Sequence, residues 1–220
     1  MLLLAIDTST SAITVALRGD GRTLAAATVL DPRAHTEHVA PLVERCLSEA
    51  GALPGDVTDV VVGNGPGPFT GLRVGIVTGV VFGHARGIPV HGVCSLDALA
   101  QDAAERLGGD ELVVATDARR KEVYWARYAV GAGAVRRLTD PAVDRPADLP
   151  QEVRALPTAG RGPLLYPELF RSPVDLLDVR AETLAAIAAA RLEAGTPLPV
   201  EPMYLRRPDA LTTAERGGRA

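Results

Sequence analysis

The chain has 220 residues, of which 47% are hydrophobic, and a formal net charge of −4 at pH 7. This composition is typical of a folded globular protein of one or two domains and argues against a disordered chain. The negative charge disfavours extended binding to a nucleic-acid backbone by this chain alone. The longest apolar stretch, 74–82, is too short to span a membrane. Residues 1–6 lack the basic flank of a signal peptide, so we expect a cytoplasmic protein without membrane contact.

Cysteine and lysine are both scarce. Cys46 and Cys94 are the only cysteines, and two thiols cannot complete a zinc site, so we expect buried, reduced side chains. Lys121 is the only lysine among 23 basic residues. The pairs Arg119–Arg120 and Arg206–Arg207 are candidates for RNA contact, although a solvated surface is the more ordinary interpretation.

The first part of the chain predicts three antiparallel strands and a helix. "LLLAIDTST", "AITVALRG" and "RTLAAATVL" are joined by short turns at 8–11 and 19–21, which force antiparallel pairing. Residues 35–51 predict a helix that Gly51 ends. Its apolar stripe consists of Val39, Leu42, Val43, Cys46, Leu47 and Ala50. Pro41 requires this helix either to begin within a turn of it or to bend there.

The next elements alternate between strands and helices. "DVTDVVVGNG" predicts a buried strand that leads into a glycine-rich loop and a helix at 70–86. "IPVHGV" predicts a short strand, and Ser95 is the expected N-cap of a helix at 95–107 that Gly108 and Gly109 end.

A second series of strands begins at "ELVVATDAR" and continues in "KEVYWARYAV" and "AVRRL". Residues 140–173 are rich in Pro and Arg and are expected to be irregular. "AETLAAIAAARLEAG" predicts the last helix, and the polar tail after Arg207 is expected to be mobile.

Both halves of the chain open with an apolar strand that ends in aspartate, at Asp7 and Asp117. Two such lobes resemble the plan of the actin-like ATPase and sugar-kinase (ribonuclease H-like) superfamily, in which the paired aspartate loops face a nucleotide. We therefore expect a two-lobed α/β fold with a shortened second lobe. The expected units are 1–109, 110–207 with a last helix that could return to the first lobe, and the tail 208–220.

Five stretches of the chain, in order and over nearly its whole length, resemble the TsaB (YeaZ) family. They are "AIDTST" (5–10), "HTEHVAPLVERCL" (35–47), "GNGPGPFTGLRVG" (63–75), "DARRKEVYWARY" (117–128) and "EPMYLRRPDA" (201–210). The third is the most specific, and the fourth supports the same family independently. Pro68 stands where many relatives carry Ser, which stiffens the loop without weakening the resemblance.

The resemblance implies a non-catalytic subunit. Proteins of this family pair with the related catalytic subunit TsaD, which transfers a threonylcarbamoyl group to N6 of adenosine 37 in tRNAs that read ANN codons. A TsaE-like ATPase acts on that pair, and the subunit alone can form a homodimer. The resemblance implies no tightly bound cofactor here, because ATP and the metal belong to the partner subunits, and tRNA contact only within the complex.

The residues themselves give little support to an independent enzyme. His35 and His38 are three apart, no carboxylate is clearly placed to complete a metal site, and no Gly-x-Ser-x-Gly elbow is present. Asp7, Thr8, Ser9 and Asp117 are interpreted as a vestigial nucleotide loop, because Ala118 and Arg119 stand where a phosphate would need backbone. The alternative is a small free-standing magnesium-dependent ATPase or phosphotransferase that uses Asp7 and Asp117. Asp7 could equally be only a turn former.

The helix after the glycine-rich loop has glycine at every fourth position, at 71, 75, 79 and 83. Four helical glycines cost roughly 3–4 kcal/mol relative to alanines. The loop lacks the Gly-Lys-Ser/Thr ending of a phosphate loop, so a ridge that lets another backbone approach is the better explanation. The apolar residues go most of the way around this helix, which predicts burial on two sides. The residues leave open whether its second cover is intramolecular.

The resemblance favours a helix bundle shared with TsaD or with a second copy of the chain. The residues expected at that interface are His35, His38, Leu42, Arg45, Cys46, Gly71, Leu72, Arg73, Gly75, Ile76, Gly79, Val80 and Gly83. On this hypothesis Gly75→Leu or Gly79→Leu abolishes pairing by blocking the approach of the partner's backbone.

Overall fold

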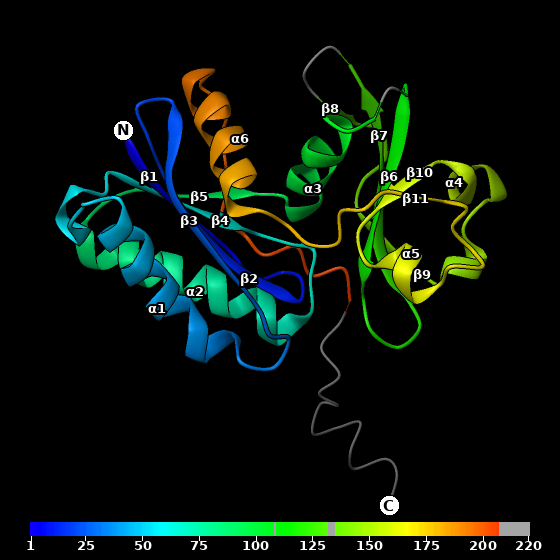
Figure 1. Cartoon of the computed structure of the whole chain (residues 1–220), viewed down its shortest axis with the longest axis horizontal. Helices are drawn as coiled ribbons and strands as arrows, with labels where there is room; N and C mark the ends of the chain where they lie inside the picture. Colours follow the sequence, from blue (N-terminus) through cyan, green and yellow to red (C-terminus); the bar gives the residue numbers. More distant parts are fainter. Residues whose placement is uncertain (108, 132–134, 207–220) are drawn as a thin grey trace, which may run out of the picture.

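The computed structural model describes residues 1–107, 109–131 and 135–206, which form two lobes side by side, each built on one sheet (Figure 1). The strands of the first sheet are β1 (Leu2–Asp7), β2 (Ala12–Gly19), β3 (Arg22–Leu30), β4 (Asp59–Gly63) and β5 (Val90–Val93). Their order is β3-β2-β1-β4-β5. The described residues do not include Gly108, one of the two glycines predicted to end the third helix, nor Arg207 and the predicted tail 208–220.

The first sheet is antiparallel on one side of β1 and parallel on the other. Ala5 pairs with Ala16 across the β1–β2 hairpin, and with Val61 on β4 in parallel register. The tight turns force the antiparallel half, whereas β4 and β5 each follow a helix that carries the chain back across the sheet.

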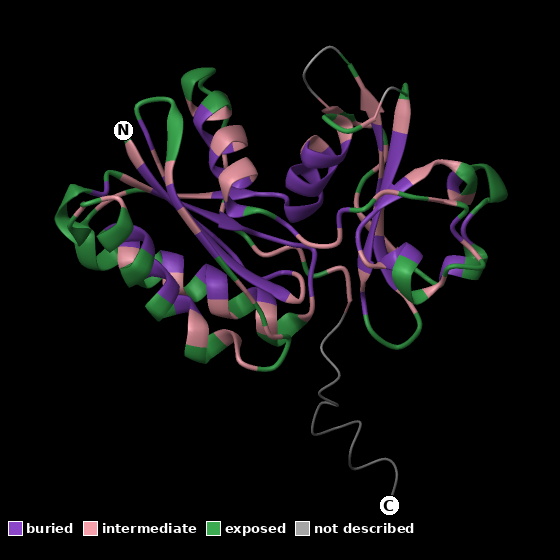
Figure 2. Cartoon of the chain, viewed as in Figure 1, coloured by how far each residue is buried: buried purple, intermediate pink, exposed green. Residues whose placement is uncertain are grey.

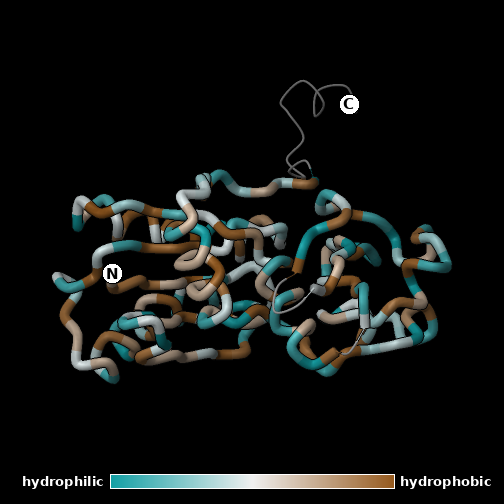
Figure 3. The backbone as a smooth tube through the Cα atoms, turned by 90° about the horizontal axis from the view of Figure 1, so that it is seen from above, coloured by the Kyte–Doolittle hydropathy of each residue, from teal (hydrophilic) through white to brown (hydrophobic). Residues whose placement is uncertain are grey.

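Helices cover both faces of this sheet. α1 (His35–Glu49) and α2 (Phe69–Arg86) lie on one face, and α6 (Ala181–Glu193) lies on the other against β1 and β2. Figure 2 shows each helix buried on its sheet side and exposed on its outer side, and Figure 3 shows hydrophobic stretches of the backbone running through the first lobe. The stripe predicted on the first helix is confirmed, since five of its six members are buried.

Pro41 lies in the interior of α1, six residues after its first residue. The alternative in which the helix begins within a turn of this proline is therefore wrong. After α1, Gly51 has φ of 65°, a left-handed conformation that ends the helix as predicted.

The second sheet repeats the plan of the first. Its strands are β6 (Glu111–Asp117), β7 (Val123–Val130), β8 (Val135–Arg137), β9 (Ala142–Asp144), β10 (Pro157–Ala159) and β11 (Ser172–Pro173). The strand order is β11-β10-β6-β7-β8, which read from its other end matches the first sheet, with β6 in the place of β1. Like β1, β6 is antiparallel to one neighbour, β7, and parallel to the other, β10. The expectation of two related lobes with a shortened second one is confirmed, and Asp7 and Asp117 end equivalent strands.

The segment 140–173 is not irregular, contrary to our expectation. It contributes the short strands β9, β10 and β11, and two short helices, α4 (Gln151–Ala155) and α5 (Gly162–Leu165), between them. The strands of two or three residues are too short for an apolar alternation to be visible in the sequence.

α3 (Ser95–Ala104) packs against both the second sheet and α6. Its buried Asp97 accepts hydrogen bonds from the Tyr128 hydroxyl (3.0 Å), from the Arg137 guanidinium (2.7 and 3.0 Å) and from Arg191 Nη2 (3.0 Å). One carboxylate on α3 thus joins β7, β8 and α6, which lie in different parts of the molecule. A buried charge with this many charge-assisted partners is well compensated.

The segment after α6 returns between the lobes. The Asn64 side-chain amide donates to the carbonyls of Pro199 and Glu201 (both 3.2 Å), and Met203 N–H donates to the Asn64 carbonyl (2.8 Å). Arg206 then donates to the Ala118 carbonyl in the second lobe. We call residues 196–206 the C-terminal strap.

Among the described residues, every helix is either too short or too polar to cross a bilayer.

Candidate functional site

Asp7 ends β1 and is completely buried. Its Oδ1 accepts hydrogen bonds from the Ser9 N–H and the Ser9 hydroxyl (both 2.8 Å), and its Oδ2 accepts one from the Ser95 hydroxyl (2.6 Å). Burial raises the pKa of this carboxyl above its ordinary value, in spite of these donors. Oδ1 holds the turn after β1, as expected of a turn former, whereas Oδ2 ties β1 to Ser95 at the start of α3.

Ser95 acts differently from our expectation. Cys94 is the N-cap of α3, and no side-chain hydrogen bond caps this helix. The Ser95 hydroxyl instead donates to Asp7 and accepts from Gly65 N–H (3.3 Å), so that it joins β1 to the glycine-rich loop. The N-cap prediction was wrong because this tertiary contact competes with local capping.

Thr8 inserts its hydroxyl into the backbone of α2. The hydroxyl accepts from Gly75 N–H (2.8 Å) and donates to the Gly71 carbonyl (2.7 Å). These two groups are hydrogen-bond partners in an ordinary α-helix, so the hydroxyl sits between them. The two glycines allow this approach, since a Cβ at Gly75 would come within 2.5 Å of Thr8 Oγ1.

The glycine-rich loop is closed by packing and not left open for a phosphate. Gly63, Gly65 and Gly67 are all buried. A Cβ at Gly63 would overlap Asp7 Oδ2, and one at Gly67 would come within 2.6 Å of the Ser9 carbonyl. The glycines of this loop are therefore needed where it crosses the β1–β2 turn.

The glycine ridge of α2 faces the sheet of its own chain. A Cβ at Gly79 would overlap Val62 on β4, and one at Gly83 would overlap Val90 on β5. The ridge lets a helix lie unusually close to strands, and its cover is intramolecular. The hypothesis that it admits a partner's backbone is corrected by these contacts.

The same burial removes other residues from the expected interface. Within this chain the structure buries Leu42, Cys46, Leu72, Gly75, Ile76, Gly79 and Gly83. His35, His38 and Gly71 are half-buried, and Arg45, Arg73 and Val80 are exposed. Sequence periodicity could not separate the two sides of α2, because apolar residues occur all around it.

The outer side of α2 is apolar and open. Val77, Val80 and Val81 are 56%, 39% and 60% exposed. Beside them a groove of about 430 Å³ runs between α1 and α2, and Thr36, Val39, Val74 and Val77 are among its lining residues. We call Val77, Val80 and Val81, with this groove, the outer α2 face. A contiguous exposed apolar strip of this kind is typical of a surface that contacts another molecule.

The strap extends this face at the first turn of α2. Arg73 Nε donates to the Tyr204 hydroxyl (2.8 Å), and its guanidinium lies 3.6 Å from the centre of the Phe69 ring. The Phe69 and Tyr204 rings are 5.2 Å apart. Of these three residues only Arg73 was predicted from the sequence, because Tyr204 reaches the helix through the fold alone.

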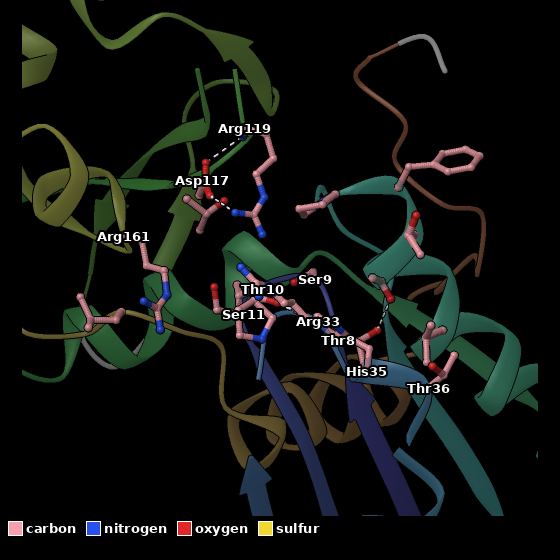
Figure 4. Close-up of a pocket in the computed structure, with 18 residues that line it drawn as sticks. Thr8, Ser9, Thr10, Ser11, Arg33, His35, Thr36, Asp117, Arg119 and Arg161 are labelled. Carbon is pink, nitrogen blue, oxygen red and sulfur yellow. Dashed lines mark hydrogen bonds and ion pairs between the residues drawn. The ribbon is translucent and has the colours of Figure 1, made fainter. Parts of the chain in front are cut away.

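A cavity of about 290 Å³ lies between the lobes (Figure 4). Its polar lining comes from the 8–11 turn, from Arg33 before α1 and His35 at its first residue, from Asp117 at the end of β6 and Arg119 after it, and from Arg161 before α5. Thr8, Ser9 and Asp117, predicted as a vestigial nucleotide loop, all line it, whereas Asp7 does not. Arg33 and Arg161 were not expected here.

The carboxylate of Asp117 is already occupied. It accepts from the Arg119 N–H (2.7 Å) and forms an ion pair with the Arg119 guanidinium (3.1 Å). Arg161 makes a two-pronged ion pair with Asp178 (2.6 and 2.8 Å). Arg119, Arg120 and Lys121 are exposed, whereas Arg206 is paired with Glu122.

The predicted histidine and cysteine residues stay apart from one another. His35 Nε2 lies 3.2 Å from the Thr10 carbonyl, and His38 lies 3.8 Å from Asp31. Within the described part of the chain no cluster of three His, Cys, Asp or Glu side chains could hold a metal ion. Cys46 and Cys94 are buried and unpaired, and burial raises their pKa values to about 11 and about 12, which makes them unreactive.

Comparison with known proteins identifies relatives over nearly the whole chain. Residues 30–165 match the family model of TsaD, the tRNA N6-adenosine threonylcarbamoyltransferase. An uncharacterised protein of Mycobacterium leprae is 47% identical over 95% of this chain, which spans 56% of that protein. One of Mycobacterium tuberculosis is 45% identical over 94% of this chain and 93% of its own length.

Relatives with an established name give the family. The tRNA threonylcarbamoyladenosine biosynthesis protein TsaB of Escherichia coli is 35% identical over 94% of this chain and 95% of its own length. YeaZ from Pseudomonas aeruginosa superimposes with a TM-score of 0.81 at 33% identity, over 93% of this chain and 99% of that one. The two lobes have the actin-like ATPase fold. The chain belongs to the TsaB (YeaZ) family of tRNA threonylcarbamoyladenosine biosynthesis proteins.

Proposed function

We propose that this protein is a non-catalytic subunit that pairs with a TsaD-type threonylcarbamoyltransferase and activates it for the modification of adenosine 37 in tRNAs that read ANN codons. The observation that carries this proposal is the outer α2 face. α2 commits its glycine side to its own sheet and leaves three valines in solvent on the other side. Such a strip is costly for a chain that works alone and favourable for one that forms a complex.

The geometry of the cleft supports a subunit over an independent enzyme. Asp7 is buried with both oxygens engaged, and Asp117 is paired with Arg119. A magnesium-dependent phosphotransferase needs open carboxylates that can reach the metal and its nucleotide. On this proposal the ATP and the metal of the reaction are held by TsaD and by a TsaE-like ATPase, and tRNA is contacted within the assembled complex.

The outer α2 face is the proposed contact surface, and a homodimer of the isolated chain would use the same surface. Arg73, Phe69 and Tyr204 at its edge are residue types that often dominate the binding energy of protein interfaces. Arg45, which is exposed on α1, and His38 belong to its rim. The residues that the sequence placed at the interface and the structure buries support this surface only from inside the chain. They are Leu42, Cys46, Leu72, Gly75, Ile76, Gly79 and Gly83.

The test is to mix the purified chain with its cognate TsaD and to measure the mass of the complex by light scattering. Val81→Asp places a charge on the proposed surface and is expected to weaken pairing at least tenfold. Leu164→Asp is the matched control, because Leu164 is equally exposed, at 59%, on the second lobe. Equal loss with both variants, or with neither, would contradict the assignment of the surface.

The same samples separate the subunit from the alternative enzyme. A mixed complex that restores tRNA modification by TsaD supports the proposal. No complex, together with magnesium-dependent nucleotide turnover by the chain alone that Asp7→Asn abolishes, would favour the ATPase alternative. Binding of tRNA by the chain without any partner, with a strong salt dependence, would instead indicate direct recognition through the arginines.

A further inference from the structure

The two sheets have four outer edges, and three of them are protected. β11 and β8, at the edges of the second sheet, have only two and three residues. β5, at one edge of the first sheet, is covered by the C-terminal strap, because Gly92 N–H donates to the Leu198 carbonyl (3.0 Å). Proteins commonly shorten or cover their edge strands, since an open edge offers unpaired backbone groups to other chains. Within the described residues, the fourth edge, β3, is neither short nor covered.

β3 is a strand of nine residues, Arg22–Leu30, whose backbone pairs with β2 alone among the described strands. α1 packs against one face of β3 and α6 approaches the other, so both helices flank the edge. The register with β2 shifts between Leu17 and Arg18, and the regular part of β3 is therefore Ala25–Leu30. We call this regular part the open edge.

The open edge has the composition of a strand that pairs further. Its sequence, AAATVL, contains neither a charged residue nor a proline, which are the residues that usually keep an edge strand from pairing. Thr28 is exposed, and Leu30 is 63% exposed. An edge of this kind accepts an additional strand from another molecule through backbone hydrogen bonds.

A second copy of the same edge meets it in antiparallel orientation under one restriction. Successive backbone N–H groups point to opposite sides of a strand, and two residues that face each other across an antiparallel pair have the same orientation. A residue of β3 therefore faces only a residue of the copy whose number is also odd or also even. The two-fold axis of such a dimer must pass through a residue and not between two residues.

An axis at Thr28 gives the best match of side chains. Leu30 then faces Ala26 of the second copy on the side of α6, and Val29 faces Ala27 of the second copy on the side of α1. Each larger side chain is opposed by an alanine, so the two strands fit closely. The two Thr28 side chains face each other on the axis, which is a favourable cross-strand pair.

We propose that two copies of this chain associate through the open edge, with their β3 strands antiparallel around an axis at Thr28, so that the two first sheets become one continuous sheet. Asp31, the nearest charged residue after the edge, lies opposite Ala25 of the second copy, so no like charges face each other there. Each copy has one such edge, and a two-fold contact uses it completely, which limits this association to a dimer.

This contact is separate from the outer α2 face. α2 packs chiefly against β4 and β1, whereas β3 lies on the far side of β2 from β1. It adds a second contact between copies to the one that a homodimer on the outer α2 face would make. A copy can therefore be bound at β3 while TsaD occupies the outer α2 face, and the proposal does not depend on pairing with TsaD.

Light scattering at increasing concentrations of the full chain tests the proposal. The parent in this test is the Val81→Asp variant, because its charged outer α2 face removes self-association there. In this background Leu30→Lys is expected to weaken the dimer at least tenfold, since it places an ammonium group on the open edge. Leu164→Lys is the matched control, because Leu164 is 59% exposed on the second lobe.

A cysteine at the axis tests the register. Residues that face each other across antiparallel strands have Cα atoms about 4.5–5.5 Å apart, within the range that a disulfide bridges. Thr28→Cys should therefore form a disulfide-linked dimer with oxidised glutathione. Thr23→Cys, equally exposed on the same strand, should not, because it lies far from its copy. The native Cys46 and Cys94 are buried and do not compete.

A dimer that Leu30→Lys weakens and Leu164→Lys does not, together with cross-linking through Thr28→Cys alone, supports the proposal. A monomer up to about 1 mM, a dimer that Leu30→Lys leaves unchanged, species larger than a dimer, or equal cross-linking at both cysteines would overturn it. Without Val81→Asp, Leu30→Lys should still pair with TsaD, so failure of the proposed function appears in that measurement instead. Thermal melting checks the fold of each variant, including Thr28→Cys, which loses the hydroxyl bond to Thr14 (2.9 Å).

Discussion

The two sides of α2 have opposite designs. The inner side carries glycine at every fourth residue, and strands β4 and β5 with the Thr8 hydroxyl occupy the space that side chains would take. The outer side carries valines that remain in solvent. A surface helix usually buries its large apolar residues and exposes its small ones, and α2 does the opposite. This arrangement indicates that glycine is needed on the inner side because the strands lie so close. It also indicates that the valines of the outer side serve a contact with a surface outside this chain.

Overfilling the inner side should have the largest effect on stability. Gly79→Leu would force a branched side chain into Val62, so α2 would have to leave the sheet, and we expect a loss of at least about 3 kcal/mol in the free energy of unfolding. Urea unfolding monitored by circular dichroism measures it. Val80→Leu is the control, because the neighbouring side chain is exposed and should cost almost nothing.

This prediction also revises the meaning of the pairing experiment first suggested by the sequence. A failure of Gly75→Leu or Gly79→Leu to bind TsaD would now follow from a disturbed fold. If Gly79→Leu keeps its full stability and still loses pairing, the ridge does contact a partner and the intramolecular account of the inner side is wrong.

Asp7 holds the turn whose Thr8 contacts the glycine side of α2, and its removal should be the next most damaging change. Asp7→Ala leaves the Ser9 and Ser95 donors buried without an acceptor, which should cost about 3 kcal/mol. Asp7→Asn keeps one carbonyl oxygen and can donate to Ser95, so its cost should stay below about 1 kcal/mol. Equal losses for both variants in urea unfolding would contradict this hydrogen-bond account.

The same residue predicts a pH dependence. Burial raises the Asp7 pKa in the folded protein above its ordinary value, so in the window between the two values the folded state binds more protons than the unfolded chain. The contribution of Asp7 to stability is therefore fully present below its ordinary pKa and is lost as the pH rises through the raised value. Asp7→Asn should remove this part of the pH profile of unfolding, whereas Asp117→Asn, on the second lobe, should not.

Thr8 tests the contact between the 8–11 turn and the glycines directly. Thr8→Val preserves the shape but removes the hydroxyl that bridges Gly75 N–H and the Gly71 carbonyl, so we expect a loss of about 1–2 kcal/mol. Thr8→Ser retains the hydroxyl and should cost less than half as much. Urea unfolding of the parent and of both variants gives the comparison. A Ser variant as destabilised as the Val variant would contradict this account, because Ser keeps the hydroxyl and lacks only the methyl group.

The outer side should show the smallest effect on stability. Val77→Ser and Val81→Ser change side chains that are more than half exposed, so the free energy of unfolding should stay within about 0.5 kcal/mol of the parent. Light scattering with TsaD should nevertheless detect weaker pairing. A large loss of stability would show that these valines already have partners in their own chain.

The inter-lobe cleft and the outer α2 face also differ in how the sequence revealed them. Asp7 and Asp117 were found from the ends of two apolar strands, and the repeated sheet order places them at equivalent positions. Arg33, Arg161 and Tyr204 have no such signal, because each reaches its site from a segment distant in the chain.

The sequence by itself determined the elements outside 140–173, the two-lobed plan and the family, because strand and helix periodicity, turn residues and the glycine-rich run are local properties of the chain. Only the tertiary structure decided which side of α2 is inside, where Ser95 donates its hydrogen bond and which arginines meet in the cleft. The physical reason is that a helix with apolar residues all around it has no periodicity to orient it. Its orientation follows from the distance at which glycine lets a strand approach, which depends on residues from β1, β4 and β5 at once.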